Sequence, residues 1–273
     1  MKALLRRGAQ HVPGAPALEV LGVTVRYGEV LALNGVSFTL QAGDQLAVVG
    51  PNGSGKSTLL GVVAGVLEPT EGEVRIFGHP PGQHTCVGFV PQRSGADLYF
   101  PVTVADVVMM GRALKLRRFG WPTRADWQAV HEALRTVGLE ELAGRSIAEL
   151  SGGQRQRAFI ARALAQEAKL LLMDEPLAGL DVAAQEDVLA SIAQLRLQGV
   201  TVLFTTHNLA LAAAHFDRVL LLNQRVIALG KPEEVLKEGV LLSAYGHHAR
   251  LPGVDWRSGL AALDDTCGDG WEQ

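Results

Sequence analysis

The sequence has few cysteines and no excess of one charge. Its 273 residues contain only two cysteines, Cys86 and Cys267, which lie far apart and lack C-x-x-C spacing. This usage fits a reducing cytosol better than a disulfide framework. The formal net charge is −3, with acidic and basic residues mixed along the chain, so the basic field that non-specific nucleic-acid binding needs is missing. Nucleic acid is therefore not an expected partner.

Long hydrophobic runs are also missing. No window reaches the roughly 20 apolar residues that a membrane-spanning helix needs. Residues 1–17 contain basic residues but only one pair of leucines, so they lack the apolar core of a signal peptide and are predicted to form a mobile tail. If a membrane takes part in the function, we expect this chain to lie beside it.

One glycine-rich stretch lies between an apolar run and a helical segment. Leu46 to Val49 is typical of a strand, and Lys56 to Val63 of a helix. In such a loop the backbone N–H groups point at one place, and the helix dipole adds partial positive charge there. The stretch matches G-x-x-x-x-G-K-[ST], and a chance glycine-rich turn would not also supply the lysine and the hydroxyl. The predicted phosphate-binding loop consists of Gly50, Pro51, Asn52, Gly53, Ser54, Gly55, Lys56, Ser57 and Thr58.

A second helix start has anion-binding character. Ser151 and Gln154 have capping-box spacing, and Gly152 and Gly153 leave the N–H groups of the first turn open. The alternative is a capped helix whose first turn happens to contain glycines. Together with the phosphate-binding loop, the pattern favours a second phosphate-seeking surface.

Polar side chains follow two predicted strands. Asp174 and Glu175 come after the apolar run Lys169 to Met173, and His207 comes after the β-branched run Val200 to Thr206. Ligands bind outside the carboxyl ends of parallel strands, so we expect these side chains to meet there. Asp174 is predicted to hold magnesium, Glu175 to position the water that attacks the γ-phosphate, and His207 to bond a terminal phosphate.

The remaining patterns predict the outline of the fold. Helical periodicity dominates from Thr103 to Val137, and Thr123 with Asp126 forms a predicted capping box. His79, His84 and Cys86 lie close together, but their spacing matches no standard zinc pattern. Predicted strands cover 18–27, 36–40, 73–77 and 87–91, a hairpin covers 218–222 and 225–229, and a short helix covers 233–238.

Taken together, the stretches 50–58 and 150–154 make the chain resemble the ATP-binding cassette (ABC) transporter ATPase family, over residues 18 to about 246. The resemblance implies an α/β fold: a P-loop NTPase (RecA-like) core, an antiparallel β subdomain and a helical insert at about 93–160. It implies one ABC ATPase domain, 18–246, which follows the tail 1–17. The Gly- and Asp-rich composition of residues 247–273 predicts a loosely ordered C-terminal extension.

The resemblance also assigns functional residues for ATP and magnesium. Residues 150–154 correspond to the signature motif, which would contribute Ser151, Gly152, Gly153 and Gln154 to nucleotide binding. The family pattern implies that Tyr27 stacks on adenine, Asp181 is the D-loop aspartate, and Ser57, Gln92 and Asp174 hold the magnesium of MgATP. It implies Glu175 as the catalytic glutamate, His207 as the switch histidine and Gln92 as the glutamine of the Q-loop.

Partners follow from the same resemblance. It implies a head-to-tail homodimer with ATP sandwiched between chains, a membrane permease, and a peripheral location at the cytoplasmic face of the inner membrane. Residues 87–93 and 100–112 are similar to the branch that imports manganese or zinc, which implies an extracytoplasmic metal-binding protein. Leu180 and the pair 98–99 depart from that branch, which leaves an iron chelate as an alternative substrate. A soluble cassette ATPase is the other alternative, although only one phosphate loop is present.

Overall fold

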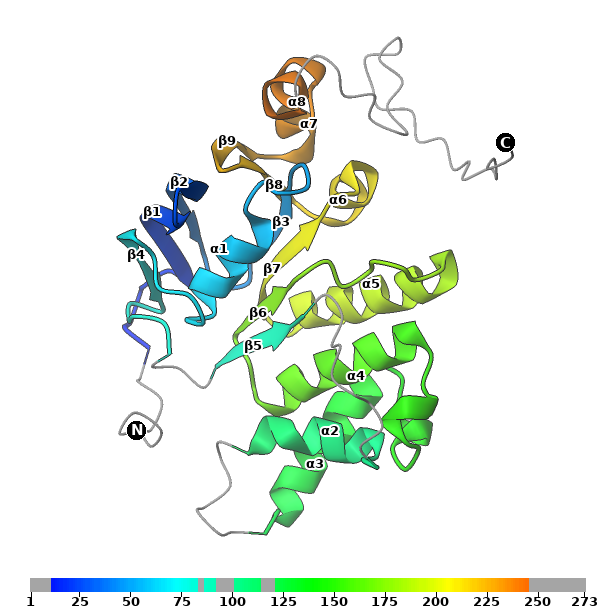
Figure 1. Ribbon diagram of the computed structural model, residues 1–273. Coiled ribbons are helices and arrows are strands. Elements are labelled where there is room, and N and C mark those ends of the chain that lie inside the picture. The colour runs from blue at the N-terminus through cyan, green and yellow to red at the C-terminus, as the bar shows by residue number, and fades with distance from the viewer. Residues whose placement is uncertain (1–10, 83–85, 92–100, 114–120, 246–273) are drawn as a thin grey trace, which may run out of the picture.

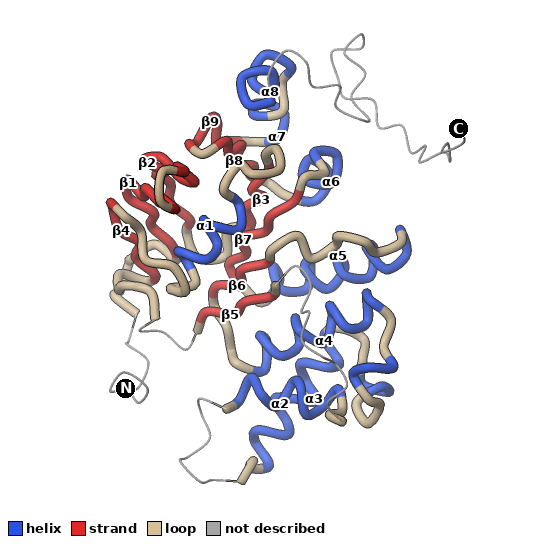
Figure 2. Tube along the Cα trace, viewed as in Figure 1, coloured by secondary structure: helices blue, strands red, loops and turns tan. Residues whose placement is uncertain are grey.

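Two β-sheets and a set of helices make up the computed structural model, which describes residues 11–82, 86–91, 101–113 and 121–245 (Figure 1, Figure 2). The smaller sheet is antiparallel in the order β2-β1-β4, and the larger has the order β5-β6-β7-β3-β8-β9. All pairs in the larger sheet are parallel except β8 with β9. The strands are β1 (Leu18–Tyr27), β2 (Val30–Leu40), β3 (Gln45–Val49), β4 (Glu71–Ile76), β5 (Val87–Val90), β6 (Leu170–Met173), β7 (Thr201–Thr206), β8 (Arg218–Asn223) and β9 (Arg225–Gly230).

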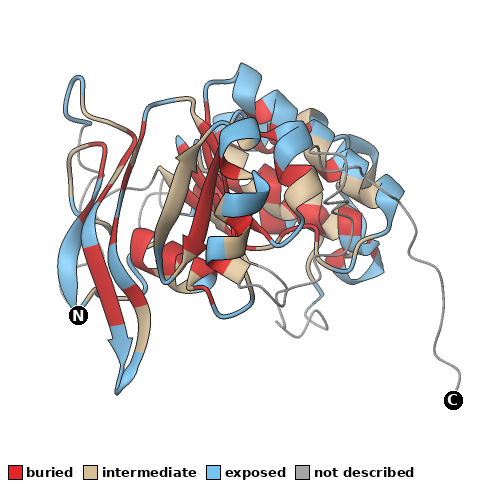
Figure 3. Ribbon diagram, turned by 90° about the horizontal axis from the view of Figure 1, so that it is seen from above, coloured by how far each residue is buried: buried red, intermediate tan, exposed pale blue. Residues whose placement is uncertain are grey.

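The central strands of the larger sheet separate two hydrophobic cores. Every residue of β3, β6 and β7 is buried, as expected for parallel strands covered on both faces (Figure 3). Side chains alternate between the faces of a strand. In β3, Leu46 and Val48 therefore enter a core shared with the smaller sheet, whereas Ala47 and Val49 enter a core shared with the helices.

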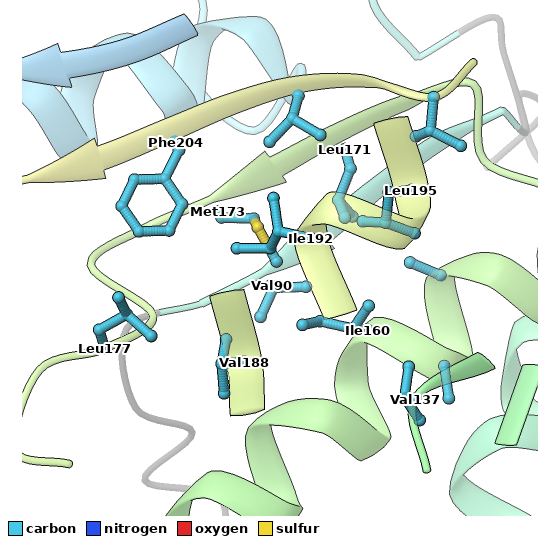
Figure 4. Packing of buried hydrophobic residues seen from close by; sticks show 14 of the residues in the cluster. Val90, Val137, Ile160, Leu171, Met173, Leu177, Val188, Ile192, Leu195 and Phe204 are labelled. Carbon is cyan, nitrogen blue, oxygen red and sulfur yellow. The ribbon is translucent and has the colours of Figure 1, made fainter. Parts of the chain in front are cut away.

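Helices cover both faces of this sheet. α1 (Lys56–Val63) packs between the two sheets, while the helical core gathers residues from α2 through α5 (Figure 1). Figure 4 shows that core, where Met173 and Phe204 of the sheet meet Val188 and Ile192 of α5 and Ile160 of α4. The other helices are α2 (Val104–Met109), α3 (Arg124–Thr136), α4 (Gly152–Ala165), α5 (Val182–Leu197), α6 (Leu209–His215), α7 (Pro232–Val235) and α8 (Glu238–Tyr245).

The helical insert is fixed by capping and by one buried arginine. The predicted capping box of Thr123 and Asp126 starts α3. Arg112, in the 3₁₀ turn Met110–Arg112 after α2, donates from Nε to Asp126 Oδ1 at 2.9 Å. Its Nη1 donates to Glu167 Oε1 at 2.7 Å and to the Ala165 carbonyl at 3.0 Å. Arg112 therefore joins the start of α3 to the end of α4.

The sequence-based outline is largely confirmed. β1 and α1 have the predicted bounds, the hairpin turns between Asn223 and Arg225 as expected, and the α/β fold with an antiparallel subdomain and a helical region is present. In the described ranges no helix is both long enough and apolar enough to cross a bilayer.

The bounds of several elements differ from the prediction, and β4 is shifted to Glu71–Ile76 from the predicted 73–77. β2 starts at Val30 rather than Val36, because a tight turn after Tyr27 lets Tyr27 pair at once with Val30. The helix predicted at 233–238 is shorter than expected: it is α7, which ends at Val235. A further helix, α8, begins at Glu238, where the predicted helix was expected to end. Leu241 and Ala244 are buried against the helical core, and this packing stabilises α8 despite Gly239 in its first turn.

Part of the predicted N-terminal tail lies against the smaller sheet. The Val12 N–H donates to the Phe77 carbonyl at 3.1 Å, and the Phe77 N–H donates to the Ala17 carbonyl at 3.3 Å. The His11 ring stacks on the Phe77 ring at 3.9 Å. Residues 11–17 are therefore attached to the end of β4, while residues 1–10 and 246–273 lie outside the described ranges.

Candidate functional site

The phosphate-binding loop turns tightly between β3 and α1. Gly50 and Gly55 have no room for a side chain, because a Cβ atom would collide with the Leu222 carbonyl oxygen at Gly50 and with the Ala32 carbonyl oxygen at Gly55. Gly55 also has φ +97°, a left-handed conformation that favours glycine. The loop is thus held between β2 and β8, with its N–H groups at the start of α1.

The loop forms one wall of a pocket of about 770 Å³. Residues 50–58 line it together with residues 30–32 of β2, Glu175, His207, Gln224 and Tyr245. The volume lies in the range of small-molecule sites, roughly 300–1,000 Å³. The structure therefore brings the predicted loop, the predicted catalytic glutamate and the predicted histidine to one cavity.

Lys56 is buried in this pocket and bonded to its own loop. Its Nζ donates to the carbonyl oxygens of Gly50 at 2.9 Å and Pro51 at 3.1 Å, and lies 3.8 Å from Glu175 Oε1. Burial lowers the pKa of Lys56 below its ordinary value, and the carboxylates of Glu175 and Asp174 oppose that change. A cation held in this way offers its charge to a polyanion in the pocket.

The two carboxylates after β6 have different surroundings. Asp174 is buried, and its Oδ1 accepts hydrogen bonds from Ser57 Oγ at 3.1 Å and from Thr205 Oγ1 at 2.8 Å. Glu175 faces the pocket, with Oε2 at 3.5 Å from His207 Nδ1. The parallel pairing of β6 with β7 places these groups at one sheet edge.

Ser57 and Asp174 fit a magnesium ion. Mg²⁺ prefers hard oxygen ligands, usually one or two carboxylates together with substrate phosphates and waters. A hydroxyl and a carboxylate oxygen 3.1 Å apart, beside the phosphate-binding loop, supply such donors. Gln92, the third predicted ligand, lies outside the described residues.

The signature residues lie apart from this pocket. Ser151 and Gln154 form the predicted capping box, and a Cβ atom on Gly153 would meet Ala184 of α5 at 2.7 Å. Asp181 caps α5, with its Oδ1 accepting from the Ala184 N–H at 2.8 Å. The start of α4 and the start of α5 are therefore neighbours, but neither contributes to the described lining of the pocket.

Tyr27 ends β1 and is half exposed, paired with Val30, which does line the pocket. The adenine-stacking residue implied by the resemblance is thus adjacent to the described wall rather than part of it. Sequence reasoning also missed residues 30–32 and three further residues at the site: Thr205, which bonds both carboxylate residues, and Gln224 and Tyr245. Thr205 carries a weak signal, since it stands two positions before His207 in a buried strand.

Comparisons with known proteins show which family the chain belongs to. A family profile described as ABC transporter matches residues 33–178. The chain is 42% identical over 233 residues to the manganese transport system ATP-binding protein MntA of Synechocystis sp., across 84% of this chain and 90% of that protein. It is 43% identical over 236 residues to the zinc transport system ATP-binding protein TroB of Treponema pallidum, across 85% and 88%. A solved structure described as a metal-chelate type ABC transporter in an inward-facing conformation aligns with a TM-score of 0.76 and 37% identity, over 85% of this chain and 89% of that one.

Proposed function

The chain belongs to the ABC transporter family as an ATP-binding subunit with ATPase activity, and from this premise we propose that it powers the import of manganese or zinc. One observation supports the ATPase activity in particular: Lys56, Glu175 and His207 lie in the same pocket as the phosphate-binding loop. Three separate segments of the sequence deliver these groups: Lys56 starts α1 after the loop that follows β3, while Glu175 and His207 follow the ends of β6 and β7 in the same sheet.

In the proposed reaction each residue has one task. The backbone N–H groups of residues 52–58 and the Lys56 ammonium hold the phosphates, and Lys56 exchanges its bonds to the loop carbonyls for bonds to phosphate oxygens. Glu175 orients the attacking water, and His207 donates a hydrogen bond to the terminal phosphate. Ser57, Asp174 and Gln92 would hold magnesium, which neutralises charge on the phosphates when bound.

We propose that a second copy of the chain completes the site. Ser151 and Gly152 are exposed at the start of α4, and the signature residues make no part of the described pocket wall of their own chain. A head-to-tail pair would place this N-terminus, with Gln154 and the Asp181 segment, over the phosphates held by the partner copy. Tyr27, at the pocket edge, would stack on adenine.

The identity of the transported metal and of the other subunits is inferred from the relatives. Proteins similar to this chain are named for manganese and zinc transport, and the similar solved structure is described as a metal-chelate type transporter. We therefore propose that the chain works with a membrane permease at the cytoplasmic face of the inner membrane, and with an extracytoplasmic metal-binding protein. In this proposal those partners, rather than this chain, select the metal. A chelated iron is the second candidate substrate, favoured by a relative of 41% identity, YfeB of Yersinia pestis, that is named for chelated iron transport.

The test is complementation of cells that lack the chain. Wild type and Glu175→Gln are expressed at equal levels, and cellular manganese, zinc and iron are measured by mass spectrometry. Wild type should restore manganese or zinc, whereas Glu175→Gln should not, because hydrolysis no longer resets the transporter. Glu233→Gln, the same substitution at an exposed site on α7, should behave as wild type. Restoration of iron alone would favour the chelate, and unchanged levels of all three metals would contradict metal import.

A further inference from the structure

One side of the pocket is formed by residues close to the C-terminal end of the described chain, and not by the phosphate-binding loop or the strand ends. Tyr245, the last residue of α8, lines the pocket together with Gln224, which lies in the turn between β8 and β9. Apart from the His207 imidazole, Tyr245 provides the only aromatic ring in the described wall. A nucleotide in this pocket would therefore meet a phenol from the end of the described chain.

One turn fixes the position of this side of the pocket. Gln224 has φ +58°, and its N–H donates to the Ser54 carbonyl of the phosphate-binding loop at 2.8 Å. Its carbonyl accepts from the Asn34 N–H at 2.7 Å. The preceding residue, Asn223, donates from Nδ2 to the Ala244 carbonyl at 2.9 Å. Two adjacent residues, Asn223 and Gln224, are thus hydrogen-bonded to the phosphate-binding loop, to β2 and to the end of α8.

The Tyr245 hydroxyl is available to a ligand. Its ring packs against the edge of the helical core, and burial raises the pKa of Tyr245 to about 12, so the phenol remains a neutral hydrogen-bond donor near neutral pH. Tyrosine hydroxyls usually have a hydrogen-bond partner when the ring is buried. Within the described part of the chain, no group forms a hydrogen bond with this hydroxyl.

We infer that Tyr245 contacts the nucleotide, with its hydroxyl donating a hydrogen bond to an oxygen of the bound ATP. The inference rests on the proposed function, since it requires the pocket to hold ATP. The bond between Asn223 and Ala244 makes Asn223 a positioning residue for this contact. Nucleotide binding would then also tie α8 to the phosphate-binding loop, from which α8 is otherwise separated by the β8–β9 turn.

The test compares two hydroxyl deletions on the same helix. Tyr245→Phe removes only the phenolic oxygen, and Ser243→Ala removes an exposed hydroxyl that donates to the Val240 carbonyl. Binding of MgATP to the full-length protein is measured by calorimetry, together with kcat and KM for hydrolysis. Tyr245→Phe should raise Kd and KM roughly five- to tenfold through the loss of one hydrogen bond, with little change in kcat. Ser243→Ala should match wild type.

A second measurement separates contact from folding. Without ATP, Tyr245→Phe should unfold at the wild-type temperature, and the rise in unfolding temperature that ATP produces should be smaller than in wild type. Wild-type Kd and KM in Tyr245→Phe, alongside weakened binding in Lys56→Ala, would overturn the inference and leave the proposed function standing. Wild-type ATP affinity in Lys56→Ala, or no ATP binding by the wild type, would instead overturn the proposed function.

Discussion

Thr205 illustrates how one side chain can orient a site without facing its ligand. It is fully buried in β7, donates to Asp174 Oδ1 at 2.8 Å and accepts from the Glu175 N–H at 2.9 Å. Glu175 has φ +41°, a conformation that non-glycine residues rarely adopt. The Thr205 hydroxyl therefore holds both the proposed magnesium ligand and the backbone of the proposed catalytic glutamate.

Thr205→Val is expected to reduce both stability and turnover. The substitution keeps the shape of the side chain but removes the hydrogen bond from the Glu175 N–H and one of the two hydrogen bonds that Asp174 Oδ1 accepts, at a total cost of about 1–3 kcal/mol. The free energy of unfolding, measured with urea, should fall by an amount in this range, and kcat should fall with it.

A matched control lies on the same strand. Thr201 is equally buried, and its Oγ1 accepts from the Gly43 N–H at 3.0 Å, away from the pocket. Thr201→Val should lower the stability while leaving kcat near the wild-type value. An equal loss of kcat in the two variants would show that Thr205 acts through general stability alone.

At the scale of elements, the helical insert depends on the carboxylate that starts α3. Asp126 Oδ2 accepts from the Thr123 hydroxyl at 2.7 Å and from the Thr123 N–H at 2.9 Å, and Oδ1 accepts from Arg112. These bonds favour the ionised form and lower the pKa of Asp126 from 3.8 to about 2. A lowered pKa in the folded state means that ionised Asp126 stabilises the fold above the unfolded pKa.

Asp126→Asn should therefore destabilise the protein in a pH-dependent way. The difference in unfolding free energy from wild type should be constant above about pH 4, and should shrink as the pH falls from 3.8 towards 2, where wild-type Asp126 becomes protonated. Urea unfolding of both proteins at a series of pH values across this range measures the difference. Asp106→Asn, in the exposed capping box of α2, is expected to cost less, and a larger loss there would contradict the role of Arg112.

Most of these elements could be predicted from the sequence, because their signals are local. β1 and α1 have the expected bounds, since a turn glycine ends the first and the phosphate-binding loop starts the second. α8 was not predicted, because its stability comes from Leu241 and Ala244 packing on residues distant in sequence. For the same reason the contribution of Tyr245 to the pocket has no sequence signal: the bond from Asn223 to Ala244 is tertiary.

At the scale of the whole molecule, the pocket and the signature residues are two separate surfaces. The described pocket wall contains Lys56 and Glu175, whereas Ser151 and Gly152 are exposed on another part of the chain. If both surfaces bind phosphate as we propose, one ATP between two copies would contact both. The oligomeric state should then depend on whether ATP is bound and uncleaved.

Glu175→Gln is predicted to accumulate as an ATP-bound dimer. The amide cannot polarise the attacking water, so hydrolysis should fall by roughly 10²–10⁴-fold while Lys56 still holds the phosphates. Light scattering after size-exclusion chromatography with MgATP should give twice the monomer mass for Glu175→Gln, and monomer without nucleotide. The double variant with Ser151→Arg, which fills the proposed contact, should remain monomeric. Near-normal hydrolysis in Glu175→Gln would remove Glu175 from its role.

The order of strands in the larger sheet has a consequence for synthesis on the ribosome. β1, β2 and β4 come from one early stretch and can pair as soon as it emerges. β3, which leads into the phosphate-binding loop, pairs only with late strands: Gln45 with Val202, and Leu46 with Arg218. Chains grow from the N-terminus, and distant pairings form slowly. In a nascent chain the phosphate-binding loop therefore emerges long before the strands that hold it in place. We expect that only a nearly complete chain can bind ATP.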